Sequence, residues 1–500
     1  MNYRTVFNII GKVLKGEALL MAFPIIVALW FHEPWMPFLE TAGIAAALGY
    51  ILDAACGDET GNIYTIDAFG IVFFSWLFIS IIGMLPFLFC EATESVVDAF
   101  FETVSGFTTT GATIFEDIDG LSHSLIFWRA FTNWIGGMGI LVFVVALFNK
   151  MPGRTSNIMR AEMPGLGLDK VVPKARKNAE FLYASYIILT IAEIFLLIIG
   201  GMPVFDSIVH GLGTAGTGGF GVMEDGLASY GAFNQWTVAV FMLLFGLNFN
   251  IFYLAIAKRW RDIFYSNELR AYLGIAFVSV IVITLAVGPT STIFGKEAVF
   301  SSWGDALRNS FFQVSAIISS TAYTTADFNA WPHLARSILF VLMLIGGCSG
   351  STAGGFKISR LVILAQNLRN SLHAMLSPRS VSSVHLNGKK IDETAVRKVS
   401  VYFFLYIILI VAGFLLVSFE SWGMETNFSA VVACMNNIGP GFGLVGPTGN
   451  YAMYSDFSKI VLALIMLFGR LEIYPILFVF SRTSKRHRSD RSERTERAIS

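Results

Sequence analysis

The sequence predicts an all-α polytopic membrane protein, with four span, half-helix, span repeats around a central pore and two further N-terminal spans. Three observations predict it. Of 500 residues, 55% are hydrophobic and 14% are charged, and the mean hydropathy of +0.64 lies far above that of soluble globules. Apolar runs such as residues 68–90 and 399–419 reach the roughly 20 residues that a helix needs to cross a bilayer. Short apolar segments followed by Gly/Thr loops recur between the long runs.

The long apolar runs predict about ten crossings. They cover residues 16–31, 37–54, 68–90, 125–148, 181–200, 235–257, 271–288, 334–366, 399–419 and 457–480. The first two belong to an N-terminal unit, residues 1–60. The N-terminus lacks a short apolar region with a small-residue cleavage site, so we expect the first span to be retained.

Four shorter apolar segments are predicted to be re-entrant half-helices, because they are too short to span a bilayer. They cover residues 91–107, 203–214, 303–319 and 427–437. A run of small and polar residues follows each one: "TTTGAT" (108–113), "TGGFG" (217–221), "STAYTT" (320–325) and "NIGPGFG" (437–443). This order of segments is an internal repeat. Its units are residues 61–150, 178–260, 269–375 and 396–482. A charged tail follows at 483–500.

The Gly/Thr loops indicate an ion path. Non-helical backbone is tolerated at membrane depth only where it is buried in protein or lines a water-filled path. Four loops on one axis would present rings of carbonyl oxygens, which can replace the hydration shell of a small cation. Glycine permits the backbone angles required, and threonine adds a hydroxyl group. The alternative is that these residues serve close helix packing or ordinary loops.

The charged residues are unevenly distributed. Residues 91–119 contain Glu91, Glu94, Asp98, Glu102, Glu116, Asp117 and Asp119 but no Lys or Arg, which predicts an acidic outer mouth that concentrates cations. The loops on the other side are basic: "KMPGRTSNIMR" (150–160), "KVVPKARK" (170–177), "KRWRDIF" (258–264) and residues 389–398. The positive-inside rule makes these loops and both termini cytoplasmic. For any single acid, solvation or capping of a half-helix is the alternative.

Two features could control flow along such a path. "GGCSGSTAGG" (346–355) interrupts the apolar run of the third repeat, which predicts a broken helix, although close small-residue packing is the alternative. Arg470 lies inside the last apolar run. A guanidinium there usually faces a cavity or a partner, and the partner could be a carboxylate on another helix.

Enzymatic function is not indicated. The four cysteines show no disulfide or zinc spacing, and the glycine-rich runs match neither a phosphate-binding loop nor a dinucleotide fingerprint. We therefore expect no organic cofactor and no nucleic-acid partner. An intramembrane enzyme would need clustered acids or a metal site, and a sodium- or proton-coupled carrier would need an ionisable site at the membrane midplane. Both remain as alternatives.

Four motifs together resemble the TrkH-type potassium transporters, of the superfamily that includes KtrB and the plant HKT proteins. They are "SGFTTTGATIF", "FWRAFTNWIGGMGIL", "GGCSGSTAGGFK" and "NNIGPGFG", and the resemblance covers essentially the whole chain. It implies potassium uptake across the cell inner membrane through a channel-like pore. It also implies a homodimer in which each chain has its own pore, regulated by a cytosolic TrkA-type ring that binds NAD or ATP.

The resemblance places a selectivity filter in the four loops. Gly111, Gly219 and Gly439 take three of its positions, and Ala322 stands where a glycine before an aromatic residue is usual. A β-carbon at positive φ would cost on the order of 1 kcal/mol, so we expect the Ala322 carbonyl to line the pore with a small twist. A weakly selective Na+/K+ channel is the alternative. The predicted potassium ligands are backbone carbonyls of Thr109, Thr110, Gly111, Gly218, Gly219, Thr321, Ala322, Ile438 and Gly439.

The resemblance also implies a gate. The glycine-rich loop of the third repeat would cross the pore below the filter, and the arginine would project into the pore as an electrostatic barrier. The predicted gate residues are Gly346, Gly347, Gly350, Ser351, Thr352, Gly354, Gly355 and Arg470. A regulator would dock on the basic cytoplasmic loops, for which contact with anionic lipid is the alternative.

Overall fold

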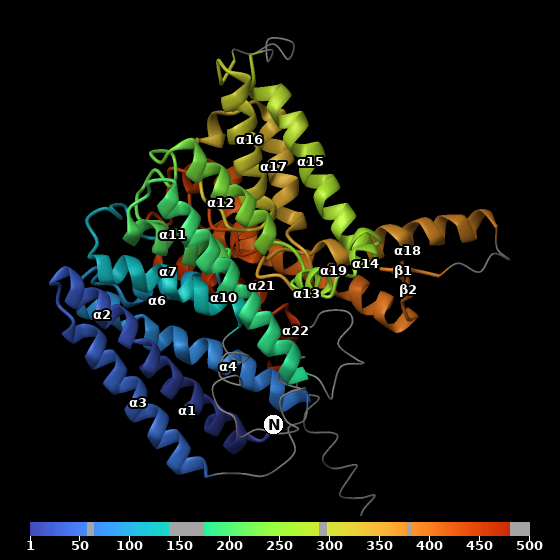
Figure 1. Ribbon diagram of the computed structural model, residues 1–500. Helices are drawn as coiled ribbons and strands as arrows, with labels where there is room; N and C mark the ends of the chain where they lie inside the picture. The colour runs from blue at the N-terminus through green and yellow to red at the C-terminus, as the bar shows by residue number, and fades with distance from the viewer. Residues whose placement is uncertain (58–64, 140–174, 290–297, 378–382, 481–500) are drawn as a thin grey trace, which may run out of the picture.

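The computed structural model describes residues 1–57, 65–139, 175–289, 298–377 and 383–480, and these residues are mostly helical (Figure 1). Their only strands form a two-residue antiparallel hairpin, β1 (His385–Leu386) and β2 (Lys389–Lys390). The predicted all-α class is confirmed. The basic segment at 150–160, part of the one at 170–177 and the charged tail lie outside the described residues.

Three helices form the N-terminal unit: α1 (Tyr3–Leu20), α2 (Ala22–Phe31) and α3 (Met36–Cys56). The first apolar helical stretch runs from Tyr3 to Phe31 and so begins earlier than the predicted span. Helices α1 and α3 pack along each other (Figure 1). A Cβ on Gly11 would lie 2.8 Å from the Gly49 carbonyl oxygen, so small residues let the two backbones approach, as is common in membrane helices.

The remaining helices fall into the four repeats. The first contains α4 (Thr65–Gly83), α5 (Leu85–Phe89), α6 (Val96–Phe107) and α7 (His123–Met138). The second contains α10 (Ala175–Ile199), α11 (Val204–Gly216), α12 (Ala232–Phe245) and α13 (Asn250–Ile256), and α14 (Trp260–Phe264) follows at its predicted end, residue 260. The third contains α15 (Asn267–Val287), α16 (Trp303–Ile318), η4 (Phe328–Ala330), α17 (His333–Ile345) and α18 (Ile358–Leu376). The fourth contains α19 (Glu393–Val417), α20 (Met424–Met435), η5 (Gly443–Val445), α21 (Asp456–Arg470) and α22 (Tyr474–Phe480).

Within the described residues, six helical stretches are long and apolar enough to cross a membrane, or seven if the bent pair α12 and α13 counts as one span. The helix after each short helix is shorter: α7, α12, α17 and α21 have 16, 14, 13 and 15 residues. These four and the six long stretches correspond to the ten predicted spans. The end of the predicted span 125–148, residues 140–148, lies outside the described residues. The chain is a multi-pass membrane protein.

Three predicted spans are broken in the structure. The break in the run 334–366, between α17 and α18, was predicted from its glycines, and the other two were not. The run 235–257 bends by 97° between α12 and α13, and the run 457–480 is interrupted between α21 and α22, where Glu472 and Ile473 have positive φ. Apolar composition predicts the length of such runs, but the bends depend on contacts with the 346–357 loop that are described below.

Eight helices form a closed ring. Each of α6, α7, α11, α12, α16, α17, α20 and α21 contacts the next in this order, and α21 contacts α6. The ring therefore alternates the short helix and the following helix of each repeat. This arrangement brings the four Gly/Thr loops, which join the two helices of each pair, to one region.

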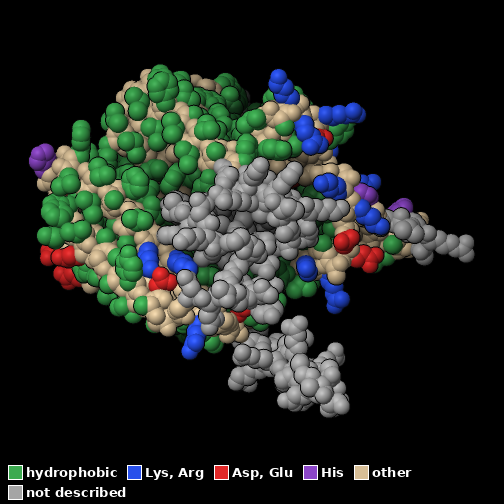
Figure 2. Space-filling view, turned by 60° about the horizontal axis from the view of Figure 1, so that its bottom comes forward, with side chains coloured by type: hydrophobic (Ala, Val, Ile, Leu, Met, Phe, Trp, Pro, Cys, Tyr) green, Lys and Arg blue, Asp and Glu red, His purple; other side chains and the backbone are tan. Residues whose placement is uncertain are grey.

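Exposed hydrophobic side chains lie on the outer helices. Phe195, Phe277 and Phe404, on α10, α15 and α19, are each more than 60% exposed. Figure 2 shows hydrophobic side chains over much of one face, with Lys and Arg mainly toward its right. Such a surface suits lipid contact. The end of α18 projects beyond the bundle (Figure 1).

Candidate functional site

The four short helices end in the same way. A residue one or two positions beyond each helix end adopts a left-handed conformation: φ is 56° at Thr109, 55° at Thr217, 55° at Ser320 and 52° at Asn437. The amide of the next residue then bonds back to a carbonyl five residues earlier: Thr110 to Ser105, Gly218 to Gly213, Thr321 to Ala316 and Ile438 to Ala433, at 2.8 to 3.0 Å. This is the Schellman motif, which satisfies carbonyls at a helix C-terminus.

A second left-handed residue follows two positions later in every loop. The φ angles are 77° at Gly111, 72° at Gly219, 60° at Ala322 and 97° at Gly439. The four loops thus share one backbone pattern, in which these four residues take equivalent places. Ala322 has the positive φ expected of it. As the one residue with a β-carbon at this position, it carries a cost of roughly 1–2 kcal/mol.

Close approach between neighbouring loops requires glycine at the other three positions. A Cβ on Gly111 would lie 1.9 Å from the Gly218 carbonyl oxygen, and one on Gly219 would lie 2.0 Å from that of Thr321. On Gly439, it would lie 2.6 Å from the Thr110 carbonyl oxygen. The loop of the first repeat therefore contacts those of the second and fourth repeats, and the loop of the second repeat contacts that of the third.

The C-termini of the four short helices carry the partial negative charge of the helix dipole, so this loop region favours a cation. The threonine hydroxyls have local partners as well. Thr110 Oγ1 lies 2.8 Å from Thr108 Oγ1 and accepts a 3.0 Å hydrogen bond from Asn437 Nδ2. Thr321 Oγ1 lies 2.7 Å from Ser319 Oγ. The bond from Asn437 joins the first loop to the fourth, whereas the contact of Thr321 lies within the third repeat. The sequence reasoning assigned neither role.

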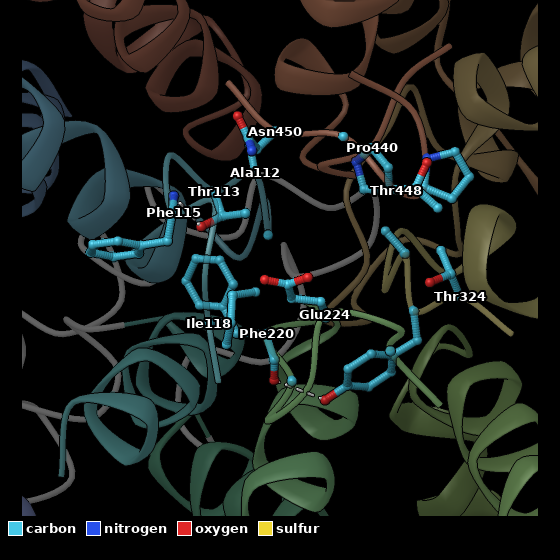
Figure 3. Close-up of a pocket in the computed structure, with 18 of the residues that line it drawn as sticks. Ala112, Thr113, Phe115, Ile118, Phe220, Glu224, Thr324, Pro440, Thr448 and Asn450 are labelled. Atoms are coloured by element: carbon cyan, nitrogen blue, oxygen red, sulfur yellow. Dashed lines mark hydrogen bonds between the residues drawn. The ribbon is translucent and has the colours of Figure 1, made fainter. Parts of the chain in front are cut away.

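A cavity of about 130 Å³ adjoins the loops. Figure 3 shows labelled residues of all four repeats on its sides: Thr113 and Ile118 of the first, Phe220 and Glu224 of the second, Thr324 of the third, Pro440 and Asn450 of the fourth. Gly111, Gly219 and Ala322 also line it. Its two carboxylates are those of Glu116 and Glu224. Glu224 was missed, although "TGGFGVMED" places it directly after the second loop.

Not all of the acidic residues at 91–119 are available to form the predicted acidic outer mouth. Glu102 is buried, and its carboxylate accepts hydrogen bonds from Arg129 Nε at 2.7 Å and from the Ile114 amide at 3.0 Å. Asp98 pairs with Lys459 at 2.5 Å. Two of the seven acids therefore hold the first repeat in place. Arg129 was missed in the sequence, although a charge within an apolar helix signals a buried partner.

The 346–357 loop, which joins α17 to α18, is not helical, as the glycines predicted. Gly346, Gly350 and Gly355 have φ of 72°, 74° and 85°. The Gly354 amide donates a 2.7 Å hydrogen bond to Ser320 Oγ, and a Cβ on Gly354 would lie 2.2 Å from the Asn436 carbonyl oxygen. The loop thus packs against the ends of the third and fourth short helices, where the Gly/Thr loops of those repeats begin.

The bend between α12 and α13 holds this loop from the other side. The Cys348 amide donates to the Gly246 carbonyl at 3.0 Å, and the Phe249 amide donates to the Gly350 carbonyl at 3.1 Å. Glu268, at the start of α15, accepts a 2.6 Å hydrogen bond from the Ser349 amide. The bend of the second repeat and the loop of the third therefore fix each other.

Arg470 lies at the same loop. Its guanidinium donates to the carbonyl oxygens of Thr352 and Gly137, both at 2.8 Å, and to that of Gly136. Glu472 lies beside the end of this loop: it bonds Arg360 on α18 and lies 3.4 Å from Nζ of Lys357, the last residue of the loop. Arg360, absent from the predicted gate set, thus connects α18 to the break between α21 and α22.

Within the described ranges, no group of three or more His, Cys, Asp or Glu side chains is arranged to hold a metal ion. The geometry offers a ring of four equivalent loops, a polar cavity on one side and a packed glycine-rich loop on the other.

Comparison with known proteins gives a consistent result. The family model for TrkH, described as a cation transport protein, matches residues 36–494. The Trk system potassium uptake protein TrkH of Salmonella typhimurium is 32% identical over 495 residues, covering 97% of this chain and 99% of that protein. TrkG of Escherichia coli, also a Trk system potassium uptake protein, is 32% identical over 96% of this chain and 98% of its own. The crystal structure of the potassium transporter TrkH from Vibrio parahaemolyticus superposes with a TM-score of 0.85. The two chains are 30% identical, and the match covers 97% of this chain and 99% of that one.

Proposed function

This chain belongs to the TrkH family of cation transport proteins, and we propose that it carries potassium ions into the cell through a channel-like pore ringed by the four loops. The observation that carries the proposal is the repeated backbone of those loops, with left-handed residues at positions such as 109 and 111 or 217 and 219. Relatives named as potassium uptake proteins support the choice of ion.

The filter would work through backbone carbonyls of the nine predicted residues. Carbonyl oxygens replace the water that potassium loses on entry, and four helix C-termini add a favourable field. Glu116 and Glu224 in the adjoining cavity would raise the local cation concentration. Potassium is the cargo here, and no organic cofactor is proposed for this chain.

The gate would combine the 346–357 loop with Arg470. The loop packs against Ser320 and Asn436 at the base of two filter loops, so it would obstruct the path in the observed conformation. A positive charge beside the path opposes a passing cation by about 4 kcal/mol at about 4 Å when the effective dielectric constant is near 20. Opening would require the loop to leave the Arg470 guanidinium.

We further propose the family's assembly: a homodimer in the cell inner membrane, with both termini cytoplasmic and a cytosolic TrkA-type ring that binds NAD or ATP. Charge distribution supports this orientation. Lys258, Arg259, Lys389 and Lys390 are all exposed. Asn387 of the β1–β2 turn accepts a 2.9 Å hydrogen bond from the Asn267 amide, which brings these two basic loops to one end of the molecule, as the positive-inside rule requires.

A weakly selective Na+/K+ channel is a second candidate, and Ala322 is the observation that favours it. Its β-carbon, at a φ of 60°, occupies the position where the other three loops have glycine. A third loop held differently from its neighbours would alter one quarter of the carbonyl ring, and selectivity depends on the number and field strength of those carbonyls.

Uptake of radioactive rubidium and sodium into proteoliposomes tests both candidates. A potassium-selective pore should take up rubidium faster than sodium, with competition by unlabelled potassium and without any imposed proton or sodium gradient. Equal rubidium and sodium uptake would favour the weakly selective channel. Uptake that occurs only with a proton or sodium gradient would indicate a coupled carrier and contradict the proposed pore.

A further inference from the structure

One filter carbonyl has a partner that its three counterparts lack. The hydroxyl of Tyr451 donates a 2.7 Å hydrogen bond to the carbonyl oxygen of Gly439. In the described parts of the chain, no side chain donates such a bond to the carbonyls of Gly111, Gly219 or Ala322. The fourth loop is therefore held by a contact that the other three loops do not have.

Tyr451 is itself firmly fixed. Its side chain is 2% exposed, and its ring lies 5.5 Å from that of Phe101 and 5.9 Å from that of Tyr454. Its amide donates a 2.8 Å hydrogen bond to the Thr113 carbonyl in the first repeat. Burial raises the pKa of Tyr451 well above its usual value, so the hydroxyl keeps its proton and can donate.

The fourth loop also differs in shape. The φ of Gly439 is 97°, against 77° at Gly111 and 72° at Gly219. Gly111, Gly219 and Ala322 line the cavity next to the filter, whereas the fourth loop contributes Pro440 to that lining. The residue that bonds to Tyr451 is thus the one whose position departs from the fourfold pattern.

We propose that Tyr451 is a positioning residue of the filter, whose hydroxyl fixes the direction of the Gly439 carbonyl and so sets the discrimination between potassium and sodium. The proposal rests on the proposed pore function. A carbonyl oxygen has two acceptor sites, so Gly439 can bond to the hydroxyl and still face an ion. Without the hydroxyl, that carbonyl could tilt toward a smaller ion, because Tyr451 is its one hydrogen-bond donor among the described residues.

Tyr323 provides a contrast within the same ring. Its hydroxyl donates to the carbonyls of Phe220 at 3.1 Å and His210 at 3.3 Å. It therefore joins the third repeat to the second, but it does not bond to a carbonyl at the Gly439-equivalent position. Of these two buried tyrosines, Tyr451 alone bonds directly to one of the predicted potassium ligands.

The test compares Tyr451→Phe with Tyr454→Phe in the full-length protein. Both substitutions remove one buried hydroxyl and keep the ring, but the Tyr454 hydroxyl donates to Asn427 Oδ1 at 3.0 Å, away from the filter. Rubidium and sodium uptake are measured in proteoliposomes with equal amounts of folded protein. Tyr451→Phe should lower the rubidium-to-sodium uptake ratio several-fold while rubidium uptake continues, and Tyr454→Phe should keep the parental ratio.

An unchanged ratio in Tyr451→Phe, or an equal fall in both variants, would overturn the proposal while leaving the pore intact. A parent protein that takes up no rubidium would instead refute the pore, and this proposal with it. Should Tyr451→Phe fail to fold, 4-fluorophenylalanine at position 451 fills the space of the hydroxyl without donating a hydrogen bond. It should give the same fall in ratio, and a parental ratio would again overturn the proposal.

Discussion

Arg470 donates a hydrogen bond from Nη1 to the carbonyl oxygen of Thr352, at 2.8 Å and across 118 residues of sequence. The two features that the sequence predicts as separate gate elements are therefore in direct contact. Because the acceptor is a backbone atom, the contact depends on the conformation of the 346–357 loop, and not on the side chain at position 352. A movement of this loop would break it.

Replacing Arg470 by Ala should raise basal ion flux in proteoliposomes without any cytosolic partner. The change removes both a positive charge beside the proposed path and the hydrogen bonds to Thr352 and Gly137. Arg470→Lys is the matched control, because it keeps the charge but lacks the planar fork that reaches both carbonyls. Its flux should lie between those of the parent and Arg470→Ala. If folded Arg470→Ala conducts no faster than the parent, the role of Arg470 is structural.

Deleting residues 351–353 should raise basal flux more than Arg470→Ala does. The deletion shortens the loop that packs against Ser320 and Asn436, so the obstruction itself would be lost. Flux is measured in the same liposomes, with the double variant included. Since Arg470 acts partly through this loop, the combined effect should be smaller than the product of the two single effects. Fully independent effects would argue against a shared gate.

Glu102→Gln should lower stability strongly. The substitution leaves the Arg129 guanidinium, only 1% exposed, without its charged partner, and breaking a buried ion pair typically costs about 3–5 kcal/mol. The measurement is the thermal unfolding midpoint of the purified protein in detergent. Asp98→Asn is the control, because the Asp98 side chain is 21% exposed in its pair with Lys459, and it should lower the midpoint less. Equal midpoints for both variants would contradict this interpretation.

The sequence predicted the helices and the loop positions well, because apolar length and glycine placement are local signals. The positive φ at Ala322 was expected from the resemblance to the TrkH-type transporters. Contacts between distant residues were not accessible in this way. The pair of Glu102 with Arg129 and the bond from Tyr451 to Gly439 depend on how helices pack. The 97° bend after α12 has the same origin, since amides and carbonyls of the 346–357 loop replace its helical partners.

Gly111→Ser should lower the rubidium-to-sodium uptake ratio or abolish transport. A Cβ there would lie 1.9 Å from the Gly218 carbonyl oxygen, so the second loop would have to move, and a φ of 77° disfavours any side chain. Gly43→Ser is the control, because a Cβ on Gly43 meets nothing within 4 Å. A parental uptake ratio in folded Gly111→Ser would show that the filter assignment is wrong.

Ala322→Gly should preserve transport and sharpen the preference for potassium over sodium. Ala322 has a φ of 60°, and glycine adopts this conformation without the cost of roughly 1–2 kcal/mol that a β-carbon adds. The third loop could then approach the geometry of the first two, where glycine has φ of 77° and 72°, and its carbonyl could match theirs. The uptake ratio of rubidium to sodium measures the effect, and the unfolding midpoint serves as an independent control. A midpoint that rises while the ratio stays parental would mean that the alanine strains the third loop without affecting ion choice. A ratio that falls would mean that the β-carbon of Ala322 helps to hold the third carbonyl in place.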